Sequence, residues 1–239
     1  MDNDELIKKW FSTDYSNHPG IKSLRSRGKY FISGKITRPQ FKNFTFQRFE
    51  VIPKKSKELI YLKGWQTVIG FHTRNIPHQG HIFIQKRALK QVNADGIMLS
   101  PTVGLKKKGD FQNEFLIESY SEILQSKVHY KKAILCCLDI YSRYAGSREA
   151  VFTAICRKNL GCTHFIIGRD HTGFKNNYSN KDLRTFFGEI GDIGINIIFF
   201  DIIFFNEKTN KYCFNKKSTK LISGSIIRDL INKKKKYLN

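Results

Sequence analysis

The chain has 239 residues and a formal net charge of +22, from 42 Lys and Arg against 20 Asp and Glu. Its hydrophobic fraction of 40% and aromatic fraction of 13% exclude general disorder, and its 17 Gly and 5 Pro exclude a collagen-like or low-complexity chain. The charge leaves three interpretations open: a nucleic-acid or membrane-surface protein, a basic solvated surface, or cations that bind small anions such as nucleoside triphosphates.

The first residues and the cysteines indicate a cytoplasmic protein. The chain starts with polar and acidic residues and no apolar run follows them, so we expect no secretory signal. No stretch approaches 18 apolar residues, so we expect no membrane span. The five cysteines form no Cys-x-x-Cys pair, which favours reduced thiols over a zinc site or disulfides.

Residues 1–60 are expected to form a short amino-terminal appendage. Pro and Gly interrupt it at many places, with Lys and Arg between short apolar pieces. We predict a short helix near the N-terminus, then loops or edge strands, then a charged linker over residues 53–58. At the other end, residues 231–239 contain four consecutive lysines and are predicted to form a basic, solvated tail.

From residue 67 onwards, short apolar runs alternate with longer amphipathic segments. Strands are predicted over residues 67–71, 96–99, 133–138, 163–167 and 195–200, and helices over residues 79–91, 111–125, 147–159 and 181–190. This alternation is typical of βαβ units, so we predict an α/β, Rossmann-like fold with a parallel sheet covered by helices on both faces. Ligands of such sheets bind beyond the carboxyl ends of the strands, in the loops that follow them.

The loop after the first predicted strand carries the strongest chemical signal. His78 and His81 are three residues apart at a predicted helix start, so they share one face, and the helix N-terminus favours a bound triphosphate. Imidazoles there could stabilise charge that develops at a phosphorus atom. Arg74 adds a planar cation for an oxyanion, and Gly80 would let a ligand approach the backbone.

Two other interpretations of these residues remain open. The histidines could be ordinary surface side chains, or His72, His78 and His81 could bind zinc. No carboxylate or cysteine nearby completes a tetrahedral set, so we expect no metal held tightly by the protein.

At this point the sequence resembles the His-x-Gly-His nucleotidyltransferases, and among them the ATP sulfurylase (sulfate adenylyltransferase) family, whose motif reads Gln-Thr-Arg-Asn-Pro-x-His-x-x-His. Four further segments are similar to that family, in the same order: residues 100–110, 143–150, 161–173 and 222–228. They include Arg-Tyr-Ala-Gly-Ser-Arg-Glu-Ala, Gly-Arg-Asp-His and Ile-Ser-Gly-Ser-Ile-Ile-Arg. The resemblance implies a nucleotidyltransferase domain over residues 61–230, with an amino-terminal part shorter than the family's.

The resemblance also implies a reaction, in which sulfate attacks the α-phosphate of ATP to give adenylyl sulfate and pyrophosphate, with Mg²⁺ entering as the nucleotide complex. Sulfate is already a dianion, so no general base is needed, and catalysis consists of positioning and charge stabilisation. The catalytic residues implied by the resemblance are Thr73, Arg74, Asn75, His78 and His81.

The implied binding residues fall into three groups. Nucleotide binding is implied for His72, Arg74, Asn75, His78, His81, Gly168, Arg169, Asp170, His171, Ile203 and Arg228. Acceptor binding is implied for His72, Arg74 and Thr172, and pyrophosphate binding for Arg143 and Arg148. Structural alternatives stay open at five positions. They are a surface charge at Arg169, a helix cap or turn at Asp170, an ion pair between Arg148 and Glu149, a helix cap at Ser225, and a core strand at Ile203.

Two departures from the family pattern fall where the family contacts sulfate. His72 replaces the family's Gln, and Thr172 replaces its Ala. The proline is also displaced, since Ile76 stands where the family has Pro and Pro77 follows. An imidazole that becomes cationic would change the preferred charge of the acceptor.

We therefore keep two alternatives to sulfate adenylyl transfer. One is the same chemistry from ATP or CTP to another acid, such as a phosphonate or a sugar phosphate. The other is a basic nucleic-acid-binding module with an idle site, although nucleic acid is not the favoured partner. The expected partners are a nucleoside triphosphate and a small oxyanion, with no membrane, in a homo-oligomer.

Overall fold

The structure is a computed structural model. It describes residues 3–27, 30, 32–35, 37, 49, 51–105, 110–126, 132–168, 180–214, 220–221 and 226. The predicted basic tail, residues 231–239, lies outside the described residues.

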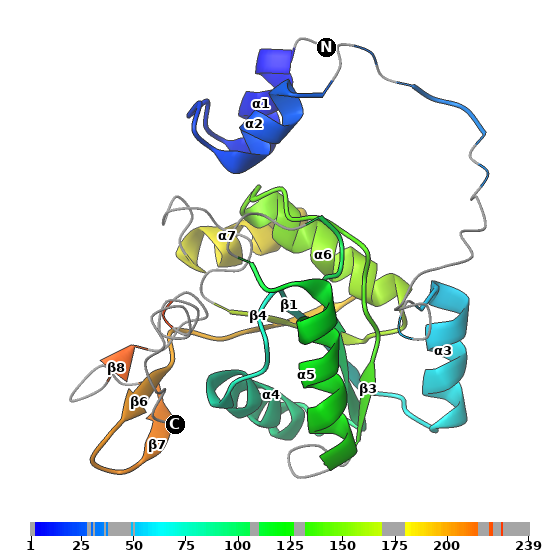
Figure 1. The fold of residues 1–239 in the computed structure, drawn as a ribbon, viewed down its shortest axis with the longest axis vertical. Coiled ribbons are helices and arrows are strands. Elements are labelled where there is room, and N and C mark those ends of the chain that lie inside the picture. The colour runs from blue at the N-terminus through cyan, green and yellow to red at the C-terminus, as the bar shows by residue number, and fades with distance from the viewer. Residues whose placement is uncertain are drawn as a thin grey trace.

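A five-stranded parallel sheet forms the centre of the structure (Figure 1). Its strands are β1 (Val68–Thr73), β2 (Gly96–Pro101), β3 (Ala133–Leu135), β4 (His164–Ile167) and β5 (Asn196–Phe199). Their spatial order is β3-β2-β1-β4-β5, so the direction of winding reverses between β1 and β4. A crevice at the carboxyl ends of those two strands is the expected ligand site of such a sheet.

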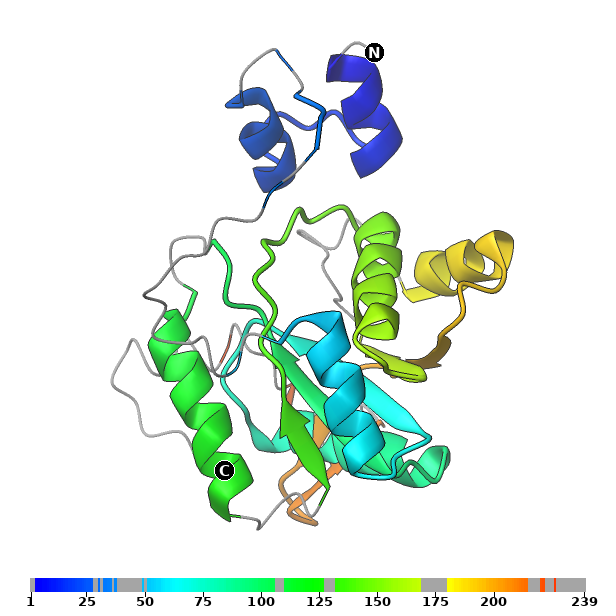
Figure 2. The same ribbon diagram turned by 90° about the vertical axis from the view of Figure 1, so that its right-hand side faces the viewer.

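Helices cover both faces of the sheet, as predicted (Figures 1 and 2). The larger helices are α4 (Gln79–Gln91), α5 (Asn113–Ser126), α6 (Ser147–Asn159) and α7 (Asn180–Ile190). Buried side chains of α4 and α5 pack with Ile69 and Phe71 of β1. Buried side chains of α6 and α7 pack with Val68 on the opposite face. Alternate residues of β1 therefore belong to different layers, because successive strand side chains point to opposite faces.

Three strand ends lie two or more residues from the prediction, and one of them is that of β2, which continues to Pro101 instead of residue 99. β1 extends to Thr73, so His72 and Thr73 are part of the strand and not of the loop. Their neighbours in the sheet are Ser100 and Pro101 of β2. β3 ends at Leu135 and not at residue 138, although Cys136 N and Leu138 N still donate to the β2 carbonyls of Leu99 and Pro101. Between them, Cys137 N donates to the Phe49 carbonyl.

The predicted linker over residues 53–58 is wrong, since α3 (Pro53–Leu62) occupies that segment. Pro53 stands in the first turn, where its missing N–H costs no helical hydrogen bond. Ser56 and Ile60 lie one turn apart and are both buried, while the lysines face solvent. The expected domain boundary after residue 60 falls inside this helix.

The amino-terminal residues are helical where the structure describes them. A short helix was predicted there and α1 (Asn3–Phe11) confirms it. The predicted loops or edge strands are wrong for α2 (Pro19–Arg25). The two helices lie close together (Figure 2), and Ile7, Phe11 and Ile21 form a small core with Ala145.

A second, antiparallel sheet was not predicted. It consists of β6 (Phe204–Asn206), β7 (Lys211–Cys213) and β8 (Lys220–Leu221), in the order β7-β6-β8. It lies beside α4 (Figure 1), where the ring of Phe83 is 5.9 Å from that of Tyr212. Strands of two or three residues are too short to show an alternating pattern in the sequence.

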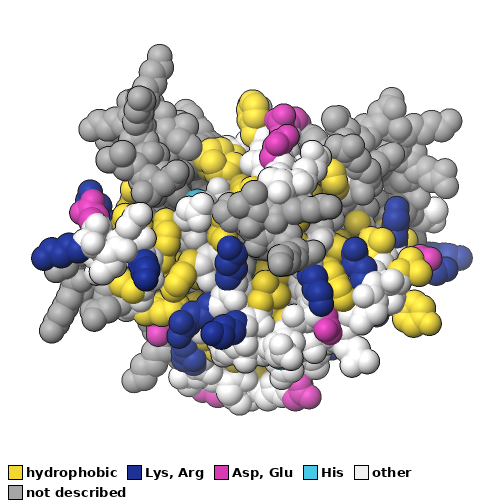
Figure 3. Space-filling model, turned by 90° about the horizontal axis from the view of Figure 1, so that it is seen from below, with side chains coloured by type: hydrophobic (Ala, Val, Ile, Leu, Met, Phe, Trp, Pro, Cys, Tyr) yellow, Lys and Arg dark blue, Asp and Glu magenta, His cyan; other side chains and the backbone are white. Residues whose placement is uncertain are grey.

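The five cysteines are free thiols, and Cys136, Cys137 and Cys162 are buried. None of the helices in the described part of the chain is long and apolar enough to cross a membrane. On the face shown in Figure 3, Lys and Arg side chains lie at several separate places among hydrophobic and neutral ones.

A substitution at Gly96 tests the packing at the start of β2. A Cβ on Gly96 would lie 2.5–2.6 Å from three ring atoms of Trp65, so Gly96→Ala must displace that indole. We expect a loss of about 1–3 kcal/mol in the free energy of unfolding. Urea unfolding measures this loss, and Trp65 emission in a Trp10→Phe background reports the displacement.

The matched control is Gly188→Ala in α7, where an added Cβ meets no described atom within 4 Å. Because Ala favours a helix over Gly, we expect stability to be unchanged or higher by up to about 1 kcal/mol. Equal losses in the two variants would contradict the packing described at Trp65.

Candidate active site

The end of β1 turns sharply, and Thr73 makes the turn. Its hydroxyl accepts a hydrogen bond from the Asn75 amide at 3.0 Å, and its carbonyl accepts one from the Thr102 amide at 3.0 Å. Thr73 is buried, so both hydrogen bonds are shielded from solvent and hold the backbone of the turn. The turn carries Arg74 out of the sheet toward the loops that follow the neighbouring strands.

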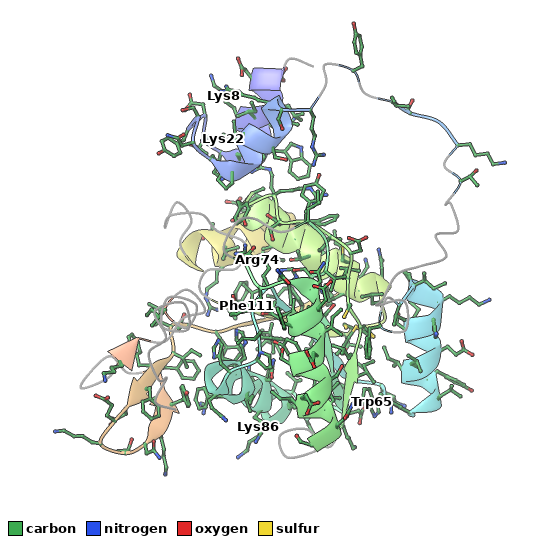
Figure 4. All side chains as sticks on the ribbon, in the orientation of Figure 1. Lys8, Lys22, Trp65, Arg74, Lys86 and Phe111 are labelled. Atoms are coloured by element: carbon green, nitrogen blue, oxygen red, sulfur yellow. The ribbon has the colours of Figure 1, made fainter. Side chains whose placement is uncertain are left out.

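Arg74 links three of those loops. Its Nη1 donates to the hydroxyl of Tyr144 at 2.7 Å, and its guanidinium lies 5.0 Å from the centre of the Tyr144 ring. The same Nη1 is 3.7 Å from a carboxylate oxygen of Asp110. Figure 4 labels Arg74 and also Phe111, the residue after Asp110. The loops after β1, β2 and β3 therefore meet at one guanidinium.

Tyr144 is held in place by a buried carboxylate. Its φ of +62° is in the left-handed region, which is unfavourable for a tyrosine. Glu149 accepts hydrogen bonds from the amides on either side, at 2.8 Å from Arg143 N and 3.1 Å from Ala145 N. Burial raises the pKa of Glu149, although these bonds to the amides favour its charged form. Glu149 thereby fixes the ring against which Arg74 packs.

His78 and His81 come together at the start of α4. His78 is the N-cap residue, and its Nδ1 accepts from the His81 amide at 3.3 Å. The two rings stack with their centroids 3.7 Å apart. Burial lowers the pKa of His78 to about 4, and burial with the neighbouring His78 lowers the pKa of His81 well below 6.5. Both imidazoles are therefore neutral at neutral pH, and each carries one N–H.

The space beside Gly80 is filled by protein, so the expectation that a ligand approaches the backbone there is wrong. An added Cβ would lie 3.1 Å from the His78 ring and 3.1 Å from Cδ1 of Ile203. Ile203 is buried in the hydrophobic core, as the core-strand alternative expects, but it lies just before β6 and outside any described strand. The structure does bring Ile203 close to the histidines.

Gly168 follows β4 at the carboxyl edge of the sheet. An added Cβ there would meet no described atom within 4 Å, so its surroundings are open on the described side. The other residues expected at this edge, Arg169, Asp170, His171 and Thr172, lie outside the described residues, as do Ser225 and Arg228.

Arg143 and Arg148 make their described contacts away from Arg74. The guanidinium of Arg143 packs on the rings of Tyr141 (4.3 Å) and Phe152 (4.8 Å). It borders a cavity of about 140 Å³ against α1 and α2. Arg148 Nη1 donates to the Ser12 hydroxyl at 3.3 Å. The alternative ion pair between Arg148 and Glu149 is not formed, because the Glu149 carboxylate accepts from the two backbone amides.

The sequence analysis missed Arg157, which is completely buried in α6. Its Nη2 donates to His72 Nδ1 at 2.8 Å and to the Ser100 carbonyl at 3.2 Å. Burial lowers its pKa to about 10, so it keeps its charge at neutral pH. Its position on the sheet-facing side of the helix, one turn after Thr153, was the available signal.

Within the part of the chain that the structure describes, no group of three or more His, Cys, Asp or Glu side chains could hold a metal ion. His72 presents Nδ1 to the Arg157 cation, which opposes a zinc ion at that atom.

The fold is a Rossmann-like α/β fold, and the loops after β1, β2 and β3 meet at the carboxyl edge of the sheet, where folds of this class bind their ligands. The ATP-sulfurylase family model matches residues 47–237, and the chain belongs to that family. Its relatives include the sulfate adenylyltransferases of Pyrococcus abyssi and Thermococcus onnurineus. The first is 38% identical and the match covers 95% of this chain and 61% of that protein. The second is 36% identical, with 96% and 62% covered.

The chain thus spans about three fifths of the length of these curated relatives. A solved structure, "Hexameric APS kinase from Thiobacillus denitrificans", has a TM-score of 0.64 at 18% identity, and the match covers 84% of this chain and 38% of that one. That likeness supports the Rossmann-like fold alone. The family resemblance and the fold class inferred from the sequence are confirmed.

The lowered pKa of His78 predicts a loss of stability in acid. Its pKa is about 4 in the folded protein against 6.5 for the ordinary side chain. Between these values the unfolded chain binds more protons, so the free energy of unfolding falls as the pH drops from 6.5 to 4. His78→Gln removes this titration and keeps an acceptor for the His81 amide. We expect the melting temperature of the wild type to fall more steeply over that range than that of the variant.

Thermal unfolding followed by circular dichroism at several pH values measures the two slopes. The His78 contribution has an upper bound of about 3 kcal/mol. Parallel slopes would show that His78 is not kept neutral by burial.

Proposed function

We propose that this chain carries the adenylyl-transfer site of a sulfate adenylyltransferase. A sulfate oxygen attacks the α-phosphorus of ATP, the bond to the β-phosphate oxygen breaks, and adenylyl sulfate and pyrophosphate leave. The observation that carries the proposal is the gathering of Arg74, His78 and His81 near the carboxyl end of β1, in a chain of the ATP-sulfurylase family. Mg²⁺ enters with the nucleotide.

The site's own charges suit this reaction. The attacking sulfate is already ionised, so the reaction needs no general base. It needs hydrogen-bond donors, and the neutral His78 and His81 can donate hydrogen bonds through their N–H groups. In this proposal His78 and His81 donate to phosphate oxygens as negative charge develops, and Arg74 holds the oxyanion. Thr73 and Asn75 shape the turn that presents Arg74.

The nucleotide half of the proposal rests partly on sequence. Gly168 leaves its described side open for a ligand. The roles of Arg169, Asp170, His171 and Arg228 rest on the motif match alone. Arg143 and Arg148 would reach pyrophosphate only by giving up their present contacts, so they are the weaker part of the site.

We extend the proposal to ATP and sulfate as partners in a cytoplasmic homo-oligomer. The family membership and the curated sulfate adenylyltransferases support the substrates. The alternative acceptor, a phosphonate or sugar phosphate with ATP or CTP, is favoured by two departures from the family, His72 in place of Gln and Thr172 in place of Ala.

A turnover assay tests the reaction. The purified protein with ATP, Mg²⁺, sulfate and a pyrophosphatase should release phosphate, because the coupled hydrolysis draws the reaction forward. The same assay is run with CTP and with phosphonates and sugar phosphates. Turnover with another acid and none with sulfate would overturn the proposal in favour of the alternative acceptor.

Substitutions at two separate histidines test the mechanism. His78→Ala should lower the turnover number by about 10²–10³, the cost of losing an oxyanion donor. His164→Ala is the matched control, since His164 begins β4 at the amino edge of the sheet. We expect His164→Ala to retain turnover close to the wild type. Unchanged turnover in His78→Ala, with the melting temperatures compared, would contradict the assigned role.

A further inference from the structure

Arg157 lies across the strand that ends at the active site. Its side chain passes over Gly70, where an added Cβ would be 2.8 Å from Arg157 Cγ and 3.1 Å from its Cβ. His72 is two residues further along β1 and therefore faces the same layer. The guanidinium reaches His72 there, with 2.8 Å between Nη2 and Nδ1. Gly70 thus provides the room through which a residue of α6 reaches a residue of the site.

This contact determines where His72 carries its proton. An arginine side chain has only donors, so His72 Nδ1 must accept with a lone pair. The proton of a neutral imidazole is then on Nε2. A cationic imidazole would place an N–H and a second positive charge against a fully buried guanidinium, which is strongly unfavourable. The contact therefore selects one tautomer and opposes protonation.

We propose that Arg157 is a positioning residue that fixes His72 as the neutral Nε2–H tautomer, so that His72 donates a hydrogen bond to the acceptor anion. The inference rests on the proposed function for the identity of that anion. A glutamine at this position would have the same polarity, with its carbonyl oxygen toward Arg157 and its N–H toward the anion. In this proposal His72 stays neutral, so its replacement of the family's Gln keeps a hydrogen-bond donor for sulfate.

The surroundings of Arg157 agree with this role. Among the described residues, no carboxylate lies within ion-pair distance of it, and the only groups that raise its pKa are the thiols of Cys156 and Cys162. A buried cation without a paired anion is costly to a fold. Its charge acts instead on His72 and on an anion bound beside it.

The tautomer is measured directly by nuclear magnetic resonance of the protein labelled with ¹⁵N-histidine. His72 is assigned by the signal that His72→Gln removes. We expect its Nδ1 to be unprotonated and its Nε2 protonated from pH 5.5 to 8, and Arg157→Met to give a mixture of tautomers. A wild-type His72 protonated at Nδ1, or an unchanged spectrum in Arg157→Met, would overturn the inference.

Kinetics tests the consequence. Arg157→Met should raise the KM for sulfate roughly tenfold, the effect of losing one oriented donor to an anion, with little change in the KM for ATP. Gly70→Ala displaces the Arg157 stem without changing any charge and should give a smaller defect of the same kind. His72→Gln, which can still accept from Arg157 and donate to the anion, should raise the KM for sulfate less than His72→Leu, which can do neither.

The matched control is Lys158→Met, which removes the next cation of α6, bonded to the Ile193 carbonyl at 2.8 Å. It should lower the melting temperature and leave the KM for sulfate unchanged. A merely structural Arg157 would behave as Lys158 does, and that result would overturn the inference. If the wild type turned over no sulfate, the proposed function would fall, while the tautomer measurement would still decide the role of Arg157.

Discussion

The guanidinium of Arg74 is the contact on which the arrangement of the site depends. A parallel sheet brings the ends of its strands to one edge, but it does not fix the loops that follow them. Here those loops are joined because Arg74 bonds to Tyr144 and lies beside Asp110. Arg74 and Tyr144 are themselves held in position. The turn at Thr73 positions Arg74, and the buried carboxylate of Glu149 positions Tyr144. The site is therefore a closed set of contacts and not three independent loops.

The two layers of the fold supply different groups to this edge. His78 and His81 come from α4, on one face of the sheet, and the Arg157–His72 pair comes from the other face. The alternation of β1 explains the division, because Gly70 and His72 face α6 while Phe71 faces α4. An anion at the end of β1 would thus meet donors from both layers. No single sequence motif contains them all.

Much of this fold follows from local pattern, and the exceptions have physical causes. The bounds of α4 and α6 agree with the prediction to the residue, because each helix follows a loop with a glycine or proline near its end and leads into the next short apolar strand. α3 was missed because proline and lysines resemble a linker, and only the buried side chains of Ser56 and Ile60 show that one face packs on the sheet. β6 to β8 are too short to carry a period.

The site was predictable only in part, for a related reason. Arg74, His78 and His81 stand in one motif, so their sequence spacing shows them. Glu149 and Arg157 act through burial, and an isolated sequence gives no sign that a charged residue is buried until its tertiary partners are known. The same holds for His72, whose protonation depends on a residue 85 positions away.

Burial affects the arginines and the histidines of this basic chain differently. The pKa of Arg157 falls to about 10 and still leaves it charged at neutral pH, whereas the pKa of His78 falls to about 4 and leaves it neutral. Guanidinium groups can therefore provide a constant positive charge at the site, and the neutral imidazoles can provide directional hydrogen bonds through their N–H groups. In the proposed reaction, a site built this way would bind the dianionic acceptor without any proton transfer. That division matches a reaction whose nucleophile arrives already ionised, and it gives only a few of the chain's 42 cations a part in the chemistry.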